Sequence, residues 1–486
     1  MNTEIKNLGE LIKANYKSRS IKTELRENLI ENIRNKKRSF SGIHGYEDSV
    51  IPQLERAILS QHNINLLGLR GQAKTRLARL MVQLLDEYIP AIEGSDINDD
   101  PLNPISSYGK NQISLLGNDT PIKWIHRNER FFEKLATPDV TISDLIGDID
   151  PIKAANLKLD YSNERIIHFG MIPRAHRSIF VINELPDLQA RIQVALFNIL
   201  EEGDIQIRGF QLRLPLDLQF IFTANPEDYT NRGSIVTPLK DRIGSQILTH
   251  YPKTIEIAQT ITNQEAKLQE SRICDIHIPQ LAKDLVEQIG FEARKSEYVD
   301  AKSGISARMS ITAYENLLST TEHRCIISNS KETSIRFTDI LGMIPSITGK
   351  IELVYEGEQE GAIFVAEMLI NNAAQTLFNK YFPKIKKIEN EDEVGPYDEL
   401  INWFFNETSF DLLDDSSEEE YYDGLNKIKP LDNLIAIYMG NVELNDIPFI
   451  KELILWALVS YNKLDRHRID NGYSFKDQYG AFFSNI

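Results

Sequence analysis

A loop able to hold phosphate is the clearest chemical signal in this sequence. An apolar run at residues 64–67 leads into a glycine-containing loop, and Lys74 and Thr75 then open an amphipathic helical pattern. In this order, backbone N–H groups and the helix N-terminus face an anion, the lysine reaches the β- and γ-phosphates, and the threonine hydroxyl ligates Mg²⁺. The usual pattern is G-x-x-x-x-G-K-[ST], and Ala73 stands in place of its second glycine. The residues expected to bind nucleotide are Gly68, Leu69, Arg70, Gly71, Gln72, Ala73, Lys74, Thr75 and Arg76.

A second apolar run, residues 179–182, ends in Asn183 and Glu184. The end of a buried strand in an α/β sheet places such side chains beside the phosphate loop. In P-loop ATPases an Asp here holds the hydrated Mg²⁺, and a Glu orients or deprotonates the attacking water. Asn183 keeps an acceptor oxygen but removes a charge, so metal affinity and turnover should fall, whereas Glu184 retains the role of base. Asn183→Asp should then tighten Mg²⁺ and raise turnover, unless the surroundings of Asn183 have adapted to a neutral group.

A third apolar run, residues 220–224, ends at Asn225, whose amide could touch the γ-phosphate or its water. Arg242 follows in the segment 238–244. Its planar, permanently charged guanidinium suits it to stabilise a transferring phosphoryl group. Without the other motifs, such an arginine would be read as a surface charge.

Composition narrows the class of protein. The chain has 486 residues, of which 42% are hydrophobic, and this predicts two or three domains with real cores. Residues 1–22 mix charges and lack the apolar core of a signal peptide, and no apolar run is long enough to span a membrane, so a soluble, cytoplasmic protein is expected. The net charge of −17 argues against nucleic-acid binding as the main role of the surface, although not against such a face inside an oligomeric ring. Cys274 and Cys325 are too few for a disulfide framework or a zinc cluster and are expected to be buried thiols.

The pattern of the chain indicates several regions. Apolar β-type runs alternate with amphipathic stretches between residues 40 and 252, which is typical of a parallel α/β sheet. The acidic run 411–420 is expected to be a solvated loop and not a metal site. The expected regions are an N-terminal helical extension at 1–38, an α/β nucleotide-binding domain at 39–252, a helical domain at 253–344, and a mainly helical C-terminal region at 345–486.

Taken together, these motifs resemble those of AAA+ ATPases of the magnesium chelatase small-subunit and MoxR type, over about residues 40–343. Residues 68–75 are similar to the Walker A loop, in which MoxR-type members commonly carry Ala before the Lys. Residues 179–184 are similar to Walker B, with Asn183 as a departure, and Asn225 falls in a segment that resembles sensor 1. The resemblance implies an AAA+ parallel sheet at 39–252 with a helical lid at 253–344. It also implies a ring, expected to be a hexamer, in which Arg242 reaches the nucleotide of the neighbouring subunit.

Three further stretches fit the same family. Residues 40–47, with Ile43, His44 and Gly45, resemble the segment that packs on adenine. Residues 141–177 resemble the helix-2 insert that faces the ring pore. Residues 304–308 resemble sensor 2, which implies that Arg308 contacts the γ-phosphate, although an exposed helix arginine would look the same. No family is recognised beyond Met343, and an integrin-type metal-binding domain is not expected there.

The function expected from this resemblance is that of a ring-forming ATPase. It would use ATP and Mg²⁺ to remodel or activate a partner, either a protein client or a protein with an integrin-type metal-binding domain. One alternative is a nucleotide-gated binding module with little or no hydrolysis, because Asn183 weakens the metal site. A less favoured alternative is the ATPase subunit of a true magnesium–porphyrin chelatase. ATPase activity of the wild type beside Asn183→Asp separates the first two.

Overall fold

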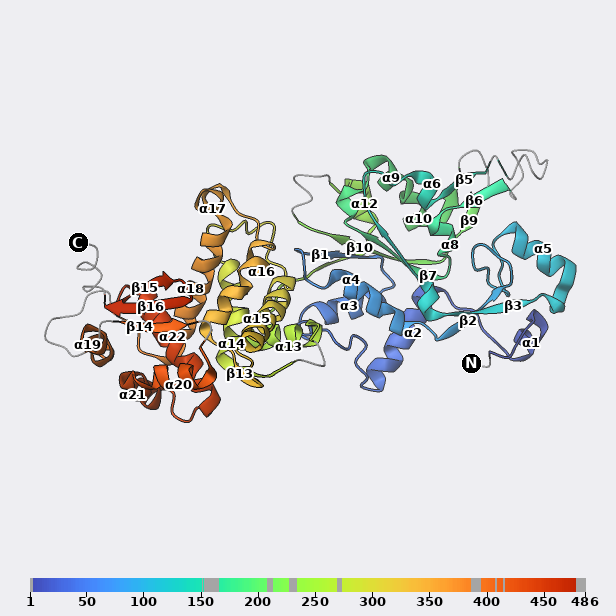
Figure 1. The fold of residues 1–486 in the computed structure, drawn as a ribbon. Coiled ribbons are helices and arrows are strands. Elements are labelled where there is room, and N and C mark those ends of the chain that lie inside the picture. The colour runs from blue at the N-terminus through green and yellow to red at the C-terminus, as the bar shows by residue number, and fades with distance from the viewer. Residues whose placement is uncertain are drawn as a thin grey trace. The chain divides into compact units, whose positions relative to one another are not determined.

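The computed structural model divides the chain into two compact units, Met1–Tyr251 and Pro252–Ile486 (Figure 1). The residues that the structure describes are 3–150, 152, 166–207, 213–226, 234–268, 273–385, 395–406, 409–413 and 416–477. Among the helices in these ranges, none combines the length and the apolar character that crossing a membrane requires. Cys274 and Cys325 are both buried free thiols, as predicted.

The first unit is built on a five-stranded sheet in the order β11-β1-β10-β7-β4. Every neighbouring pair in this sheet is parallel, so all strands end at the same edge. The predicted β-type runs form three adjacent strands of this sheet, which confirms the expected parallel α/β architecture. The strands are β1 (Ile64–Leu67), β4 (Phe131–Leu135), β7 (Ser178–Asn183), β10 (Leu218–Ala224) and β11 (Ser245–Leu248).

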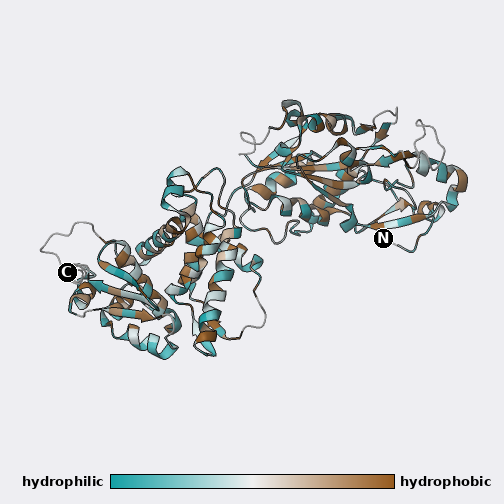
Figure 2. Cartoon of the chain, turned by 45° about the horizontal axis from the view of Figure 1, so that its top comes forward, coloured by the Kyte–Doolittle hydropathy of each residue, from teal (hydrophilic) through white to brown (hydrophobic). Residues whose placement is uncertain are grey.

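Helices cover both faces of this sheet because successive side chains of a strand point to opposite faces. Ile179 and Val181 of β7 pack in one core with α2 (Ile21–Arg34), α3 (Val50–Leu59) and α4 (Lys74–Leu80). Phe180 and Ile182 pack in a second core with α9 (Ala190–Ala195), α10 (Phe197–Glu202) and α12 (Thr237–Arg242). Figure 1 shows these two helical layers, and Figure 2 shows hydrophobic residues in brown along the strands between them.

Smaller elements complete the first unit. Two-stranded antiparallel pairs join β2 with β3, β5 with β6, and β8 with β9. The predicted insert region 141–177 contains β5 and β6, and residues 151 and 153–165 of it lie outside the described residues. These elements are α1 (Leu8–Lys13), β2 (Tyr88–Ile92), α5 (Ser107–Leu116), β3 (Ile122–His126), α6 (Ile142–Leu145), β5 (Gly147–Ile149), β6 (Ile167–Phe169), α8 (Met171–Arg174), β8 (Asp204–Gln206) and β9 (Arg213–Pro215).

A buried ion pair holds the N-terminal helix α2 against the sheet. Glu24 accepts two hydrogen bonds from the Arg130 guanidinium, at 2.6 and 2.7 Å. Arg130, the residue before β4, is 1% exposed, and its Nε also donates to the backbone oxygen of Arg177 at 2.9 Å. A bidentate guanidinium–carboxylate pair of this kind is strong and geometrically specific. Within the predicted helical segment 1–38, helix α2 is thus packed on the sheet of the first unit.

The second unit is mainly helical, as predicted. Side chains from both sides of residue 344 share one hydrophobic core, among them Leu285, Leu317, Leu369 and Leu453. Two small sheets were not predicted: the parallel pair β12–β13 and an antiparallel sheet in the order β14-β16-β15. The elements are α13 (Ile255–Glu265), β12 (Asp275–His277), α14 (Gln280–Ala293), α15 (Arg308–Ile327), β13 (Glu332–Ser334), α16 (Ile344–Thr348), α17 (Tyr355–Glu360), α18 (Ala362–Tyr381), α19 (Asp398–Asn406), β14 (Phe410–Leu413), α20 (Glu418–Asn426), α21 (Lys429–Tyr438), α22 (Ile447–Ser460), β15 (Leu464–Ile469) and β16 (Gly472–Asp477).

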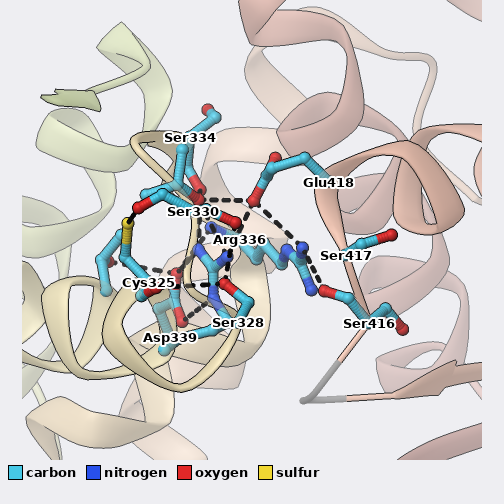
Figure 3. Close-up of polar contacts among 12 residues, drawn as sticks. Cys325, Ser328, Ser330, Ser334, Arg336, Asp339, Ser416, Ser417 and Glu418 are labelled. Atoms are coloured by element: carbon cyan, nitrogen blue, oxygen red, sulfur yellow. Dashed lines mark hydrogen bonds and ion pairs between the residues drawn. The ribbon is translucent and has the colours of Figure 1, made fainter. Parts of the chain in front are cut away.

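The acidic run 411–420, predicted to be a solvated loop, has exposed carboxylates at Asp411, Glu419 and Glu420, but its described residues include strand and helix and two buried arginines draw Glu418 inward (Figure 3). Its first residues belong to β14, residues 414–415 lie outside the described residues, and Glu418 begins α20. Glu418 Oε1 accepts hydrogen bonds from Arg324 at 3.0 Å and from Arg336 at 3.1 Å. Arg324 also donates to both oxygens of Asp339, at 3.0 and 2.8 Å. A buried guanidinium requires such partners, so the acidic side chain turns inward to supply them.

Candidate functional site

The phosphate loop connects β1 to α4 and depends on two unusual backbone positions. Gly71 and Ala73 have positive φ angles of 73° and 55°. Glycine adopts this left-handed conformation without strain, whereas an alanine does so at a cost of about 1 kcal/mol. Lys74 then begins α4, as the loop pattern predicts. Ala73 therefore takes the same backbone path that the second glycine of the pattern would take.

Gly68 opens the loop at a position with no room for a side chain. A Cβ there would collide with Oγ1 of Thr249 and Oε1 of Gln72. These two atoms are joined by a hydrogen bond of 2.7 Å, which ties the loop to the end of β11. Gly68 N in turn donates to the backbone oxygen of Ala224 at 3.1 Å. The start of the loop is thus fixed to the two strands that flank β1.

The segment 40–47, predicted to lie beside adenine, contacts the phosphate loop through Tyr46. The Tyr46 hydroxyl donates to the backbone oxygens of Gln72 at 2.9 Å and of His250 at 2.8 Å. Burial raises the pKa of Tyr46 to about 12, which keeps this hydroxyl protonated as a donor. Ile43 is buried in the core of the unit, and His44 and Gly45 are half-buried. The structure therefore brings this segment to the loop, and its contact with adenine stays a prediction.

Lys74 and Asn225 are brought into direct contact. Lys74 Nζ donates to Asn225 Oδ1 at 2.7 Å, to the backbone oxygen of Leu69 at 2.9 Å, and to that of Gly68. Asn225 follows β10 directly and is 6% exposed. The ammonium group thus lies among the backbone oxygens of the loop, between the ends of β1 and β10.

Asn183, at the end of β7, faces Thr75. Asn183 Oδ1 accepts hydrogen bonds from Thr75 Oγ1 at 3.3 Å and from Thr223 Oγ1 at 3.0 Å. Its Nδ2 donates to Oε1 of Glu133 on β4 at 2.5 Å. Mg²⁺ prefers oxygen ligands and is usually bound through one or two protein groups together with phosphates and water. Thr75 Oγ1 and Asn183 Oδ1 lie 3.3 Å apart, and the Glu133 carboxylate contacts the same amide. These oxygens are a set of ligands that fits Mg²⁺.

Glu184 directly follows β7 and takes a left-handed backbone conformation, with φ 55° and ψ 49°. Its N–H donates to Thr223 Oγ1 at 3.1 Å, so one hydroxyl contacts both Glu184 and Asn183. The Glu184 side chain is half-buried, and no hydrogen bond joins its carboxylate to another described residue. A carboxylate in this setting has unused acceptor positions for a water molecule.

The two arginines predicted to contact nucleotide, Arg242 and Arg308, have their described contacts with residues other than those at the ends of β1, β7 and β10. Arg242, at the end of α12, pairs with Glu201 at 2.7 Å, donates to the backbone oxygen of Pro238 at 3.0 Å, and stacks 5.1 Å above the ring of Phe197. Arg308 is an exposed residue at the start of α15, in the second unit. The roles of both arginines at a nucleotide stay predictions.

Two residues of this cluster were not foreseen from the sequence. Glu133 lies in β4, whose residues Phe-Phe-Glu-Lys-Leu do not form an uninterrupted apolar run. Thr223 lies two residues before Asn225, and a polar residue inside an apolar run gave no distinct signal. Strand periodicity does place Thr223 and Asn225 on the same side of β10, which is the pattern that could have revealed Thr223.

The geometry of the phosphate loop predicts that one small substitution weakens ATP binding and that another leaves it intact. Gly68→Ala should weaken ATP binding about tenfold or more, since a new Cβ would disrupt the contact between Thr249 and Gln72. Ala73→Gly should preserve ATP binding, because glycine relieves the strain of the positive φ angle. Titration calorimetry with ATP measures both. Wild-type affinity in Gly68→Ala would contradict the assigned geometry, as would a loss of binding in Ala73→Gly.

A comparison with protein families gives a match over part of the chain. Residues 122–243 match the family model described as AAA domain (dynein-related subfamily). This region includes Asn183, Glu184, Asn225 and Arg242, whereas the phosphate loop precedes it. The match supports the AAA+ ATPase class that the motifs indicate, and the narrower chelatase or MoxR type stays a prediction.

Several solved structures resemble the chain. A candidate ATPase from Cytophaga hutchinsonii is 18% identical, with 74% of this chain and 97% of that chain covered and a TM-score of 0.30. NtrX from Brucella abortus in complex with ATP is 12% identical, with coverages of 73% and 66% and a TM-score of 0.35. A chain from the complex between subunits BchI and BchD of magnesium chelatase is 18% identical, with coverages of 66% and 98% and a TM-score of 0.34. At these identities and TM-scores, the likenesses do not indicate what this chain binds or acts on.

Proposed function

We propose that the protein binds ATP with Mg²⁺, hydrolyses it, and couples this cycle to the remodelling or activation of a partner protein. The observation that carries the proposal is the collection of polar groups at one edge of the sheet. Lys74 contacts Asn225 at 2.7 Å, and Thr75 contacts Asn183 at 3.3 Å, although these residues come from three distant segments. Ligands of open α/β sheets bind at the carboxyl ends of the strands, where these contacts occur.

Each group has a distinct proposed role. Lys74 binds the β- and γ-phosphates, and the Thr75 and Asn183 oxygens hold Mg²⁺. Held by these oxygens, Mg²⁺ would offset the negative charge of the phosphates. Glu184 accepts a hydrogen bond or a proton from the attacking water, and Asn225 orients that water or contacts the γ-phosphate. Because Thr223 contacts both Asn183 and Glu184, it keeps the metal-binding amide and the base in a fixed relation.

The proposed assembly is a ring in which subunits complete one another's sites. Arg242 would reach the nucleotide of the neighbouring subunit, and Arg308 would contact the γ-phosphate from the helical lid of its own chain. In the single chain, Glu201 and the Phe197 ring hold the Arg242 guanidinium in place. A guanidinium held in this way loses little freedom on contacting a phosphate, which suits a residue that acts across an interface.

Steady-state release of phosphate from ATP by the purified protein tests the proposed function. Mg²⁺-dependent turnover is expected, and it should be absent from Lys74→Ala. Asn183 favours a second candidate, a nucleotide-gated binding module, because a neutral amide replaces the charged metal ligand of the pattern. Tight ATP binding without measurable turnover would support that second candidate.

A mixing experiment tests whether Arg242 acts in trans. Arg242→Ala and Lys74→Ala subunits should each be inactive, and a mixture should recover part of the activity. Some interfaces of a mixed ring join an intact phosphate loop to an intact Arg242. An arginine supplied in this way is worth about 10³–10⁵ in rate, so a few complete interfaces should exceed the background.

The matched control for this experiment is Lys240→Ala, an exposed cation on the same helix, which should keep its activity. Chain exchange in the mixture should be verified independently, for example by fluorescence transfer between labelled subunits. If exchange occurs and the mixture stays inactive, Arg242 serves its own subunit or has a structural role.

A further inference from the structure

Glu133 is a carboxylate beside the proposed metal site that no motif predicts. It lies in β4, next to β7, and its side chain is 26% exposed. Its Oε1 accepts from Asn183 Nδ2 at 2.5 Å, and its Oε2 accepts from Arg79 at 2.6 Å. Arg79 lies on α4, four residues after Thr75, and its own side chain is 66% exposed. Solvent screens salt bridges to such exposed partners, so Arg79 offsets the charge of Glu133 only in part.

The neighbours of Asn183 fix which way its amide points. Two hydroxyls, from Thr75 and Thr223, donate to Oδ1, and Glu133 accepts from Nδ2. An amide has one accepting end and one donating end, so this arrangement of partners permits a single orientation. The accepting oxygen is turned towards Thr75, where an aspartate oxygen would lie, and the donating nitrogen is turned towards Glu133.

Resting on the function proposed above, we propose that Glu133 is a positioning residue that supplies the negative charge missing at Asn183. The amide transmits this charge, because its hydrogen bond to Glu133 polarises Oδ1 and holds it towards the metal. An aspartate at 183 would instead place a second carboxylate against Glu133, about where Nδ2 now lies 2.5 Å from Oε1. Two carboxylates at such a distance repel each other strongly. The pair thus divides the role of one Walker B aspartate between two strands.

The inference predicts that a charge at either position suffices, whereas charges at both are unfavourable. Glu133→Gln should weaken the Mg²⁺-dependent part of ATP binding by roughly tenfold or more, the usual effect of losing a group that supports a metal ligand. Asn183→Asp alone should not improve it. The double variant Glu133→Gln, Asn183→Asp should recover binding to within about threefold of the wild type, since it restores one carboxylate and one amide.

The measurement is ATP affinity by calorimetry at several Mg²⁺ concentrations and with Mg²⁺ removed by chelation. Binding without Mg²⁺ should be equal in the wild type and the variants, which separates an effect on the metal from general damage. Glu93→Gln, at an exposed carboxylate elsewhere in the unit, is the matched control. Circular dichroism during urea unfolding checks that each variant is folded. Glu133→Asp keeps the charge on a shorter side chain, so it should bind Mg²⁺ better than Glu133→Gln if charge decides the result.

Three results would overturn the inference. One is an unchanged Mg²⁺ dependence in a folded Glu133→Gln protein. Another is a double variant that binds Mg²⁺-ATP no better than the weaker-binding of the two single variants. These results differ from a failure of the proposed function, in which the wild type itself would show no Mg²⁺-dependent ATP binding, and that result would remove both proposals. An Asn183→Asp variant that alone binds Mg²⁺ more tightly than the wild type would also contradict the inference.

Discussion

Lys74→Ala should reduce ATP affinity by about a hundredfold or more. The ammonium group lies among loop oxygens and 2.7 Å from Asn225 Oδ1, in the space that the phosphates of a bound nucleotide would share. Hydrogen bonds to charged groups contribute about 1.5–3 kcal/mol each, and losing two of them corresponds to a factor of about 10² to 10⁴. Calorimetric titration with ATP measures the loss.

The control for this prediction is Lys13→Ala, which removes an exposed lysine of α1 with no expected effect. Loss of the Lys74 ammonium also leaves the Asn225 oxygen without this donor, so thermal unfolding should be recorded beside the titration. If the folded Lys74→Ala protein binds ATP as the wild type does, the loop at 68–75 is not a phosphate loop.

Glu184→Gln should leave ATP binding intact and slow hydrolysis by about 10²-fold or more. Glutamine fills the same volume and still contacts water, but it is a far poorer proton acceptor, and a positioned general base contributes about 10²–10⁴ to a rate. In this variant, the rate of single-turnover hydrolysis should therefore fall, whereas the affinity for ATP should stay at the wild-type value. The protein should accumulate in its ATP-bound state, and size-exclusion chromatography with ATP should show the ring at its largest population.

Glu202→Gln, an exposed glutamate of α10, provides the matched control and should hydrolyse ATP at the wild-type rate. Wild-type turnover in Glu184→Gln would mean that Glu184 is a strand-end carboxylate without a catalytic role. A joint loss of binding and hydrolysis would point instead to its strained backbone, whose φ angle of 55° is unusual for a residue other than glycine.

The part of the site that lies at the ends of β1, β7 and β10 could be predicted, because the sequence patterns that form these strands are local. Residues 179–182 are wholly apolar, residues 64–67 and 220–224 contain one polar residue each, and such short apolar runs become the buried strands of a parallel sheet. The strands β1, β7 and β10 confirm this prediction. Since parallel strands end at one edge, the strand assignments place the phosphate loop and Asn225 at the same edge of the sheet, and the direct contact of Lys74 with Asn225 is a finding of the structure.

The part of the site that involves the edge strands β4 and β11 depends on pairing between distant segments of the chain, so it could not be predicted in the same way. β4 is an edge strand whose polar residues interrupt its apolar pattern, so neither the strand nor the position of Glu133 is evident from the sequence. Thr249, which fixes Gln72, follows the other edge strand, β11. In the second unit, Glu418 belongs to an acidic run that reads as solvated until the buried arginines that it pairs with are known.

The buried ion pair between Glu24 and Arg130 affects the register in which strand β4 pairs with β7. An edge strand has one pairing partner, and a slip of one residue exchanges the side chains on its two faces. In β4, such a slip would bring Phe132 or Lys134 to the place of Glu133, and the lysine would reverse the charge behind Asn183. Arg130 immediately precedes β4, is 1% exposed, and is held by Glu24 and by the backbone oxygen of Arg177 at 2.9 Å. A slipped strand would pull this guanidinium away from both partners. The contact between Arg130 and helix α2 therefore stabilises the observed register of β4.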